Sequence, residues 1–231
     1  MKKVKIVFLS LMMVFACFSY SNAFSYSFYG TDDGGVGSAE MDINISGNIL
    51  TVSLDNTSPT TYGDNKVNNP CITGFGFNLT NNGSVGLISW IFEAETYNSS
   101  TKVTIGSSTE SDNEYWDISQ DTNWDGLIFN YLPHVENGHN GALYNPALKS
   151  FLGEGSQNTH NYFTNALLTV NYSDAPLLGS DVVVRMTRVG EDGSLKLEGK
   201  PAVPEPGTML LLGSLASGLF GFAGLKKRFT K

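Results

Sequence analysis

The chain is poor in cysteine. Only two of its 231 residues are cysteines, Cys17 and Cys71, and Cys17 lies in an N-terminal segment that we expect to be removed. The remaining part then has no cysteine pair for an intrachain disulfide, and we expect Cys71 to be a buried free thiol. Its stability has to come mainly from an apolar core.

Basic residues are scarce in the middle of the chain. Only seven of the 14 Lys and Arg residues lie in residues 24–203, together with 21 of the 22 Asp and Glu residues, so this part carries a net charge near −14. It lacks the positive surface that nucleic-acid binding needs, and it does not favour docking on anionic lipid headgroups. High solubility and an affinity for divalent cations remain compatible with this charge.

The N-terminus has the pattern of a secretory signal peptide. Three lysines, an apolar run over residues 6–18 and small residues at positions 21–23 follow one another. We expect cleavage after Ala23, which would remove residues 1–23. Lipidation of Cys17 is a weaker alternative, because the bulky Phe15, two positions before it, stands where a small residue is required.

The C-terminus ends in an uncharged run and a basic cluster. Residues 207–225 carry no charge, and as a helix they would span roughly 28 Å at about 1.5 Å per residue. This length fits a hydrocarbon core of about 30 Å. Basic residues gather in 226–231, so the positive-inside rule places the C-terminus in the cytoplasm and the preceding domain outside. A buried C-terminal helix of a soluble domain is the alternative, and it explains the basic end less well.

A Pro-Glu-Pro tripeptide, formed by Pro204, Glu205 and Pro206, stands directly before this run. Two prolines flanking one residue favour an extended backbone, which a processing enzyme needs in its cleft. The tripeptide, the uncharged run and the basic cluster together resemble a PEP-CTERM sorting signal. The resemblance covers about the last 29 residues.

The resemblance implies a processing partner and an environment. In this family the tripeptide is recognised by exosortase, a membrane-embedded cysteine transpeptidase-like enzyme of Gram-negative bacteria, and cleavage is expected near it. Export through the Sec translocon would precede this step. Extracellular polysaccharide synthesis typically accompanies such systems. The resemblance implies nothing about the domain that is sorted.

The middle of the chain alternates with the period of β-strands. Met41, Ile43 and Ile45 alternate with polar residues, and Gly47-Asn48 separates them from a second alternating run, which predicts a tight hairpin. Further strands are expected at residues 71–79, 88–95, 102–105, 114–118, 127–131, 166–172, 182–189 and 195–197. Many short strands with Gly/Asn turns predict an antiparallel β-sandwich, either jelly-roll or immunoglobulin-like.

These patterns predict four parts of the chain. They are a signal peptide (1–23), an acidic β-sandwich domain (24–198), a linker (199–203) and a sorting signal (204–231) that contains the transmembrane helix.

One motif within the domain suggests a metal. Residues 121–126 read Asp-Thr-Asn-Trp-Asp-Gly, which fits the first half of a calcium loop and makes Asp121, Asn123 and Asp125 candidate ligands. The acid expected at the twelfth position is replaced by Leu132, so an EF-hand is not expected and a looser site would need other acids. The alternative is an Asx-rich turn between strands.

Three functions from different classes fit the sequence. The first is a non-catalytic matrix protein, anchored in the inner membrane as a precursor and then displayed or released among extracellular polysaccharide. The second is a calcium-assisted, lectin-like module in which Trp116 and Trp124 stack on sugars. The third is a secreted hydrolase, for which Glu93 and Glu95 share a strand face at a spacing that could suit glycoside hydrolysis. We expect no enzyme activity and no cofactor beyond possible calcium.

Overall fold

The computed structural model describes residues 21–64, 66–96, 101–109, 115–124, 127–135, 141–150 and 162–201. The chain divides into two compact units, Met1–Pro201 and Ala202–Lys231, and all described residues belong to the first. They form an all-β structure in which only two short 3-10 turns, η1 (Asn82–Ser84) and η2 (Pro146–Ser150), are helical. None of the described residues forms a helix long and apolar enough to cross a membrane. The span predicted at 207–225 lies outside the described residues.

Most of the described residues lie in strands. Thirteen strands join one large mixed sheet, and β4 and β5 form a separate two-stranded sheet. The bounds are β1 (Ser21–Asp32), β2 (Gly35–Ser46), β3 (Ile49–Asn56), β4 (Thr61–Tyr62), β5 (Lys66–Val67), β6 (Cys71–Leu79), β7 (Leu87–Thr96), β8 (Lys102–Ser107), β9 (Trp116–Trp124), β10 (Leu127–Val135), β11 (Leu143–Tyr144), β12 (Phe163–Tyr172), β13 (Leu178–Val189), β14 (Gly193–Glu198) and β15 (Lys200–Pro201).

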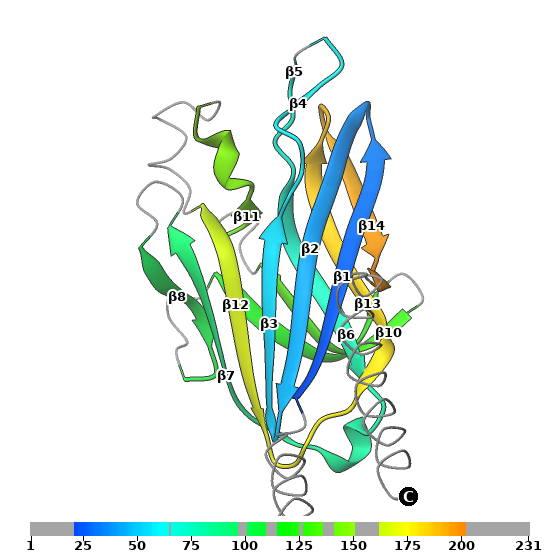
Figure 1. The fold of residues 1–231 in the computed structure, drawn as a ribbon, viewed down its shortest axis with the longest axis vertical. Coiled ribbons are helices and arrows are strands. Elements are labelled where there is room, and N and C mark those ends of the chain that lie inside the picture. Colours follow the sequence, from blue (N-terminus) through cyan, green and yellow to red (C-terminus); the bar gives the residue numbers. More distant parts are fainter. Residues whose placement is uncertain are drawn as a thin grey trace, which may run out of the picture. The chain divides into compact units, whose positions relative to one another are not determined.

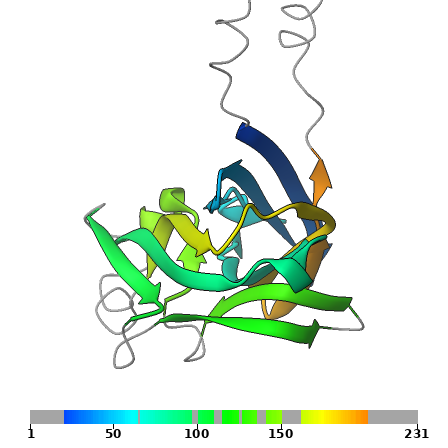
Figure 2. The same ribbon diagram turned by 90° about the horizontal axis from the view of Figure 1, so that it is seen from below.

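Strand pairing divides the large sheet into two layers (Figure 1, Figure 2). One, the β12 layer, runs β8-β7-β12-β3-β2-β1, and the other, the β6 layer, runs β9-β10-β6-β13-β14. The short strand β11 connects them, because it pairs in parallel with β12 and antiparallel with β6. Every other pairing described in the large sheet is antiparallel. The architecture is therefore sandwich-like and all-β.

The two layers enclose one main hydrophobic core. Along β2 the predicted alternation is confirmed, since Met41, Ile43 and Ile45 are buried while the residues between them are exposed. Aromatic rings join the layers: the centroids of Phe75 in β6 and Phe92 in β7 lie 5.8 Å apart. A smaller second core cluster contains Cys71, which is a buried free thiol as predicted. Apolar packing thus fixes which side of each strand faces inward.

Two hairpin tips lock together at one end of the sheet. The close approach of Gly35 to the backbone of Gly190 leaves no room for a Cβ atom, and Gly190 has a φ of +69° that favours glycine. The carboxylate of Asp32 accepts a hydrogen bond of 2.9 Å from the backbone N–H of Ser194. These contacts join the β1–β2 turn to the β13–β14 turn.

The sheet extends further at both ends than the sequence predicts. β1 begins at Ser21, and its inward residues Tyr26 and Phe28 are buried. Lys200 and Pro201, within the predicted linker, form β15 and pair with β1. This pairing covers an edge strand that would otherwise present unpaired backbone groups. Proline fits there because a strand end needs no N–H donor from it.

Candidate functional site

The two predicted processing sites lie at and beyond the ends of the described domain. Ala23 lies in β1 and pairs with Asn44. Cleavage after Ala23 would keep the β1–β2 ladder from Phe24 onwards. The sorting tripeptide 204–206 lies outside the described residues, three positions after Pro201, the last one described.

The predicted calcium motif falls on the β9–β10 hairpin. The backbones of Asp121, Asn123 and Trp124 lie in β9, which pairs with β10 up to the Trp124–Leu127 pair. Their side chains, and Asp125 entirely, lie outside what the structure describes. Among the described residues, no group of three or more His, Cys, Asp or Glu side chains could hold a metal ion. Calcium at this hairpin stays a prediction.

Trp116 lies in the core rather than on a ligand-binding surface. Its side chain is fully buried, and its indole Nε1–H donates a hydrogen bond of 2.7 Å to the carbonyl oxygen of Gly141. Its ring packs edge-on against Phe92, with centroids 4.9 Å apart. A ring enclosed in this way offers no face to a sugar, so the structure places Trp116 among the core aromatics. The sequence identifies the aromatic residue but not the direction in which it points.

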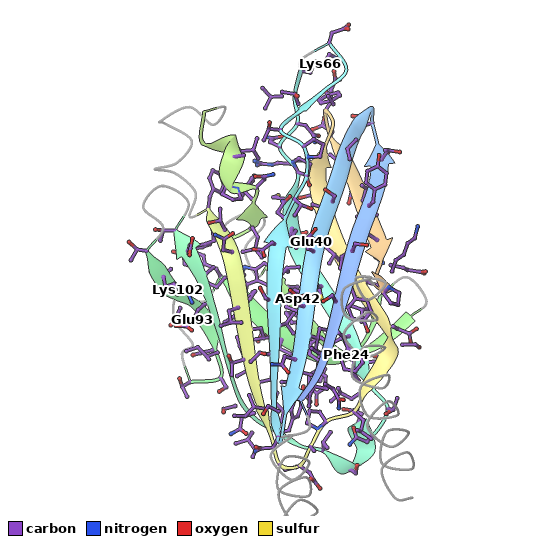
Figure 3. The ribbon with its side chains drawn as sticks, in the orientation of Figure 1. Phe24, Glu40, Asp42, Lys66, Glu93 and Lys102 are labelled. Atoms are coloured by element: carbon purple, nitrogen blue, oxygen red, sulfur yellow. The ribbon has the colours of Figure 1, made fainter. Side chains whose placement is uncertain are left out.

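Acidic side chains gather on the outward face of the β12 layer, and Figure 3 labels Glu40 and Asp42 on β2. We call Glu40, Asp42, Asp55 and Glu95 the acidic row. Asp55 lies opposite Glu40 in the ladder, and its pKa is raised by burial and by the charges of the other three acids. Asn165 donates a hydrogen bond of 2.9 Å to Glu95. Like charges on β2, β3 and β7 therefore repel one another at neutral pH.

A depression of about 300 Å³ lies on the same layer, where β8, β7 and β12 are neighbours. Along β7 the outward face passes from Ser89 and Ile91, which line the depression, to Glu93, which Figure 3 labels. The described residues of its wall are Ser89, Trp90, Ile91, Thr104, Ser107, Ser108, Thr109, Thr169 and Asn171. Seven of these nine residues carry a hydroxyl or amide group, although most of the surface that the wall presents is apolar.

Strand register brings the wall together. Asn171 of β12 lies opposite Ser89 of β7, and Thr169 lies opposite Ile91. Ile91 in turn lies opposite Ser107 of β8. Side chains that are opposite each other in this way have Cβ atoms about 5 Å apart. One row therefore joins two polar residues of β12 and β7, and the next row crosses three strands with Ile91 at its centre.

Several polar groups of the wall are unused by the described part of the protein. The hydroxyls of Ser89, Thr104 and Thr169 make no hydrogen bond to another described residue. Asn171 accepts a hydrogen bond of 2.8 Å through its Oδ1 from Asn48, which leaves its Nδ2–H groups without a described partner. These groups can bind an external ligand without breaking an internal bond.

Other groups of the wall hold its shape. The Oγ of Ser108 accepts a hydrogen bond of 3.2 Å from the backbone N–H of Trp90. The hydroxyls of Ser107 and Thr109 lie 3.3 Å apart. The first bond ties the residue after β8 to β7, and the second joins the last residue of β8 to the segment that follows it.

The chemistry available in the depression is hydrogen bonding and apolar contact. Within the described wall there is no acidic, basic or imidazole side chain, so its serines have no neighbouring general base there. None of these residues stands out in the sequence, where the only signal is the polar half of the alternation in β7 and β12.

Comparison of the chain with protein-family models, with curated proteins and with solved structures found no match in any of the three.

Proposed function

We propose that this chain is an exported, non-catalytic protein of a Gram-negative cell surface or extracellular matrix, which exosortase cleaves near Pro204–Pro206. The precursor crosses the inner membrane through the Sec translocon and is held there by a helix at 207–225. After cleavage, the acidic domain is displayed or released among extracellular polysaccharide.

The observation that carries this proposal is the order of parts in the last 29 or so residues. A lone Pro-Glu-Pro would be weak support, because proline-rich linkers are common before membrane anchors. Here the tripeptide is followed by an uncharged run of membrane-spanning length and then by a basic cluster. A signal-peptide pattern at the other end of the chain supports the same route.

The proposal includes the finer architecture of the domain. We assign it to the antiparallel β-sandwiches of jelly-roll or immunoglobulin-like topology, in which two polar outer faces surround an apolar core. Supporting features are the division of the sheet into two layers and the antiparallel ladders within each. Such a domain needs no disulfide if its core is large enough, which fits a single buried cysteine.

The sorting step is tested by fractionating cells with and without exosortase. The proposal expects the protein at the surface or in the medium when exosortase is present. Without the enzyme it should accumulate as a larger form in the inner membrane. A Pro204→Ala/Pro206→Ala variant should behave in wild-type cells like the protein in cells that lack exosortase. Unchanged size and location in both strains would overturn the assignment.

Carbohydrate binding is the second candidate function. The depression favours it, because hydroxyl and amide groups beside an apolar side chain suit the alternating polar and apolar surfaces of a sugar. The calcium-assisted version, with Asp121, Asn123, Asp125 and Trp124, predicts that a chelator abolishes polysaccharide pull-down. Pull-down that survives chelation would exclude it.

A further inference from the structure

The depression between β8, β7 and β12 has three properties that together point to a ligand class. Its lining includes an exposed apolar side chain and hydroxyl and amide groups that no other described residue uses, and it lies beside a concentration of negative charge. Each property narrows the chemistry of the molecule that fits.

The first property is an exposed apolar contact. Ile91 is 38 % exposed although it lies in the middle of a strand, and Ile49, opposite Asn171 in the ladder, is 43 % exposed. Neighbouring outward positions are polar. Covering this apolar surface with the apolar face of a ligand removes it from water, which favours binding.

The second property is the pattern of unused polar groups. Ser89 and Asn171 lie in one cross-strand row, and Thr169 lies two residues along β12. Successive outward positions on a strand are about 6.6 Å apart, and opposite positions are about 5 Å apart. A polymer of linked sugar rings can therefore meet several of these groups at once, with donors and acceptors on both sides.

The third property is the charge beside the depression. Glu93 and Glu95 follow Ile91 on the same outward face, and the remaining acids of the acidic row lie across β3 and β2. This negative field opposes the approach of a polyanion. Lys102 of β8 lies opposite Glu95 and offsets one of these charges, while the described wall of the depression carries no cation of its own.

We propose that this depression binds a neutral polysaccharide, using Ser89, Thr104, Thr169 and Asn171 as hydrogen-bonding groups and Ile91 as the apolar contact. The inference rests on the proposed function in one respect, since it supposes that the domain works among extracellular polysaccharide. It assigns binding to a different place from the β9–β10 hairpin, and it needs no metal.

Binding is measured by affinity electrophoresis of the full chain, solubilised in detergent, through gels that contain dextran, pullulan or galactomannan. Alginate, a polyanion, serves as the contrasting probe. We expect retardation by at least one neutral polymer, which should be insensitive to added salt and to EDTA because no charge or metal takes part. Alginate should cause none.

Two variants place the binding in the depression. Thr169→Trp fills it and should abolish retardation. Ser89→Ala/Thr169→Ala removes two unused hydroxyls and should weaken binding about tenfold. Ser53→Ala is the matched control, because Ser53 lies on the same outward face in β3 but outside the depression. Circular dichroism and thermal melting establish that each variant is folded.

The outcomes separate the site from the sorting proposal. Three results would each overturn this site. The folded wild-type chain is not retarded by any neutral polymer, Thr169→Trp is retarded as strongly as the wild type, or alginate retards the wild type as strongly as a neutral polymer does. None of these results affects exosortase processing, which is read from localisation. Binding without processing would leave the site standing and remove the sorting assignment.

Discussion

The two faces of the β12 layer are built from the same strands, yet they contrast in composition and in role. The inward face is apolar and buried, with Leu168 and Val170 of β12 fully enclosed. Between and beside them, Thr169 and Asn171 point outward into the depression. In one strand, the inward residues thus stabilise the core, and the residues between them are available for contact with other molecules.

The outward face is itself divided. Its acidic row brings four carboxylates together, and burial and the other three charges raise the pKa of Asp55. The described wall of the depression carries no charge. Under the proposed binding of a neutral polysaccharide, the charge on this face limits what approaches, and the uncharged part makes the contacts. Substitutions on the two faces, and on the two parts of the outward face, should therefore have different consequences.

The largest loss of stability is expected from substitutions on the inward face. Phe92→Ala removes a fully buried ring that contacts both Phe75 and Trp116 and should lower the free energy of unfolding by about 3–5 kcal/mol. Ile91→Ala, one residue away and outward, should cost far less. Urea denaturation of both variants measures the difference, and equal losses would contradict the assignment of the faces.

The next effect concerns a polar group in the second core cluster. Arg188 donates a hydrogen bond of 3.1 Å to the hydroxyl of Tyr144, which is fully buried. Arg188→Ala should cost about 1–3 kcal/mol because it removes a charged donor from a buried hydroxyl. Arg188 also has a φ of +59°, so Arg188→Gly should lose less by relieving backbone strain. A glycine variant less stable than the alanine variant would show that this strain is unimportant.

A smaller effect, an increase in stability at pH 7, is expected when a carboxylate of the acidic row is neutralised. Because the pKa of Asp55 is raised on folding, the folded state binds more protons than the unfolded state just above the usual aspartate pKa. Its contribution to stability therefore falls as the pH rises from that usual value through the raised one. Asp55→Asn should remove this part of the pH dependence and raise Tm at pH 7 by about 2 °C.

The control for that prediction is Asp64→Asn, which makes the same charge change between β4 and β5, away from the acidic row. Thermal melting from pH 3 to neutral pH follows both variants. Equal stabilisation by the two would mean that overall charge, rather than the acidic row, sets the effect.

The smallest change in stability is expected from substitutions in the depression. Thr169→Ala should change the free energy of unfolding by no more than about 0.5 kcal/mol, because its hydroxyl has no described internal partner. Ser53→Ala on the same face should behave alike. A loss above about 1 kcal/mol for Thr169→Ala alone would indicate an internal role and weaken the binding assignment.

Local patterns predict much of the all-β fold. Alternation over residues 39–46 fixes which side of β2 is buried, and Gly47-Asn48 fixes the turn to β3, because both depend on neighbouring residues only. Each of these features is set within a few residues of sequence. The buried thiol of Cys71 is predicted on other grounds, because it has no cysteine partner.

Features that depend on distant residues are not visible in the sequence. Nothing local shows that β12 pairs with both β3 and β7, or that β11 connects the layers through two residues. The depression combines residues near 90, 106 and 170, so its composition appears only once the register is known. Trp116 illustrates the same limit, since its direction depends on the packing of Phe75 and Phe92.

We propose that the acidic β domain loses the targeting segments at both ends of the chain. Intact-mass spectrometry of the surface-exposed protein tests it most directly. We expect a mature form that begins at Phe24 and ends near Pro204–Pro206. A surface-exposed form that still ends at Lys231 would contradict it.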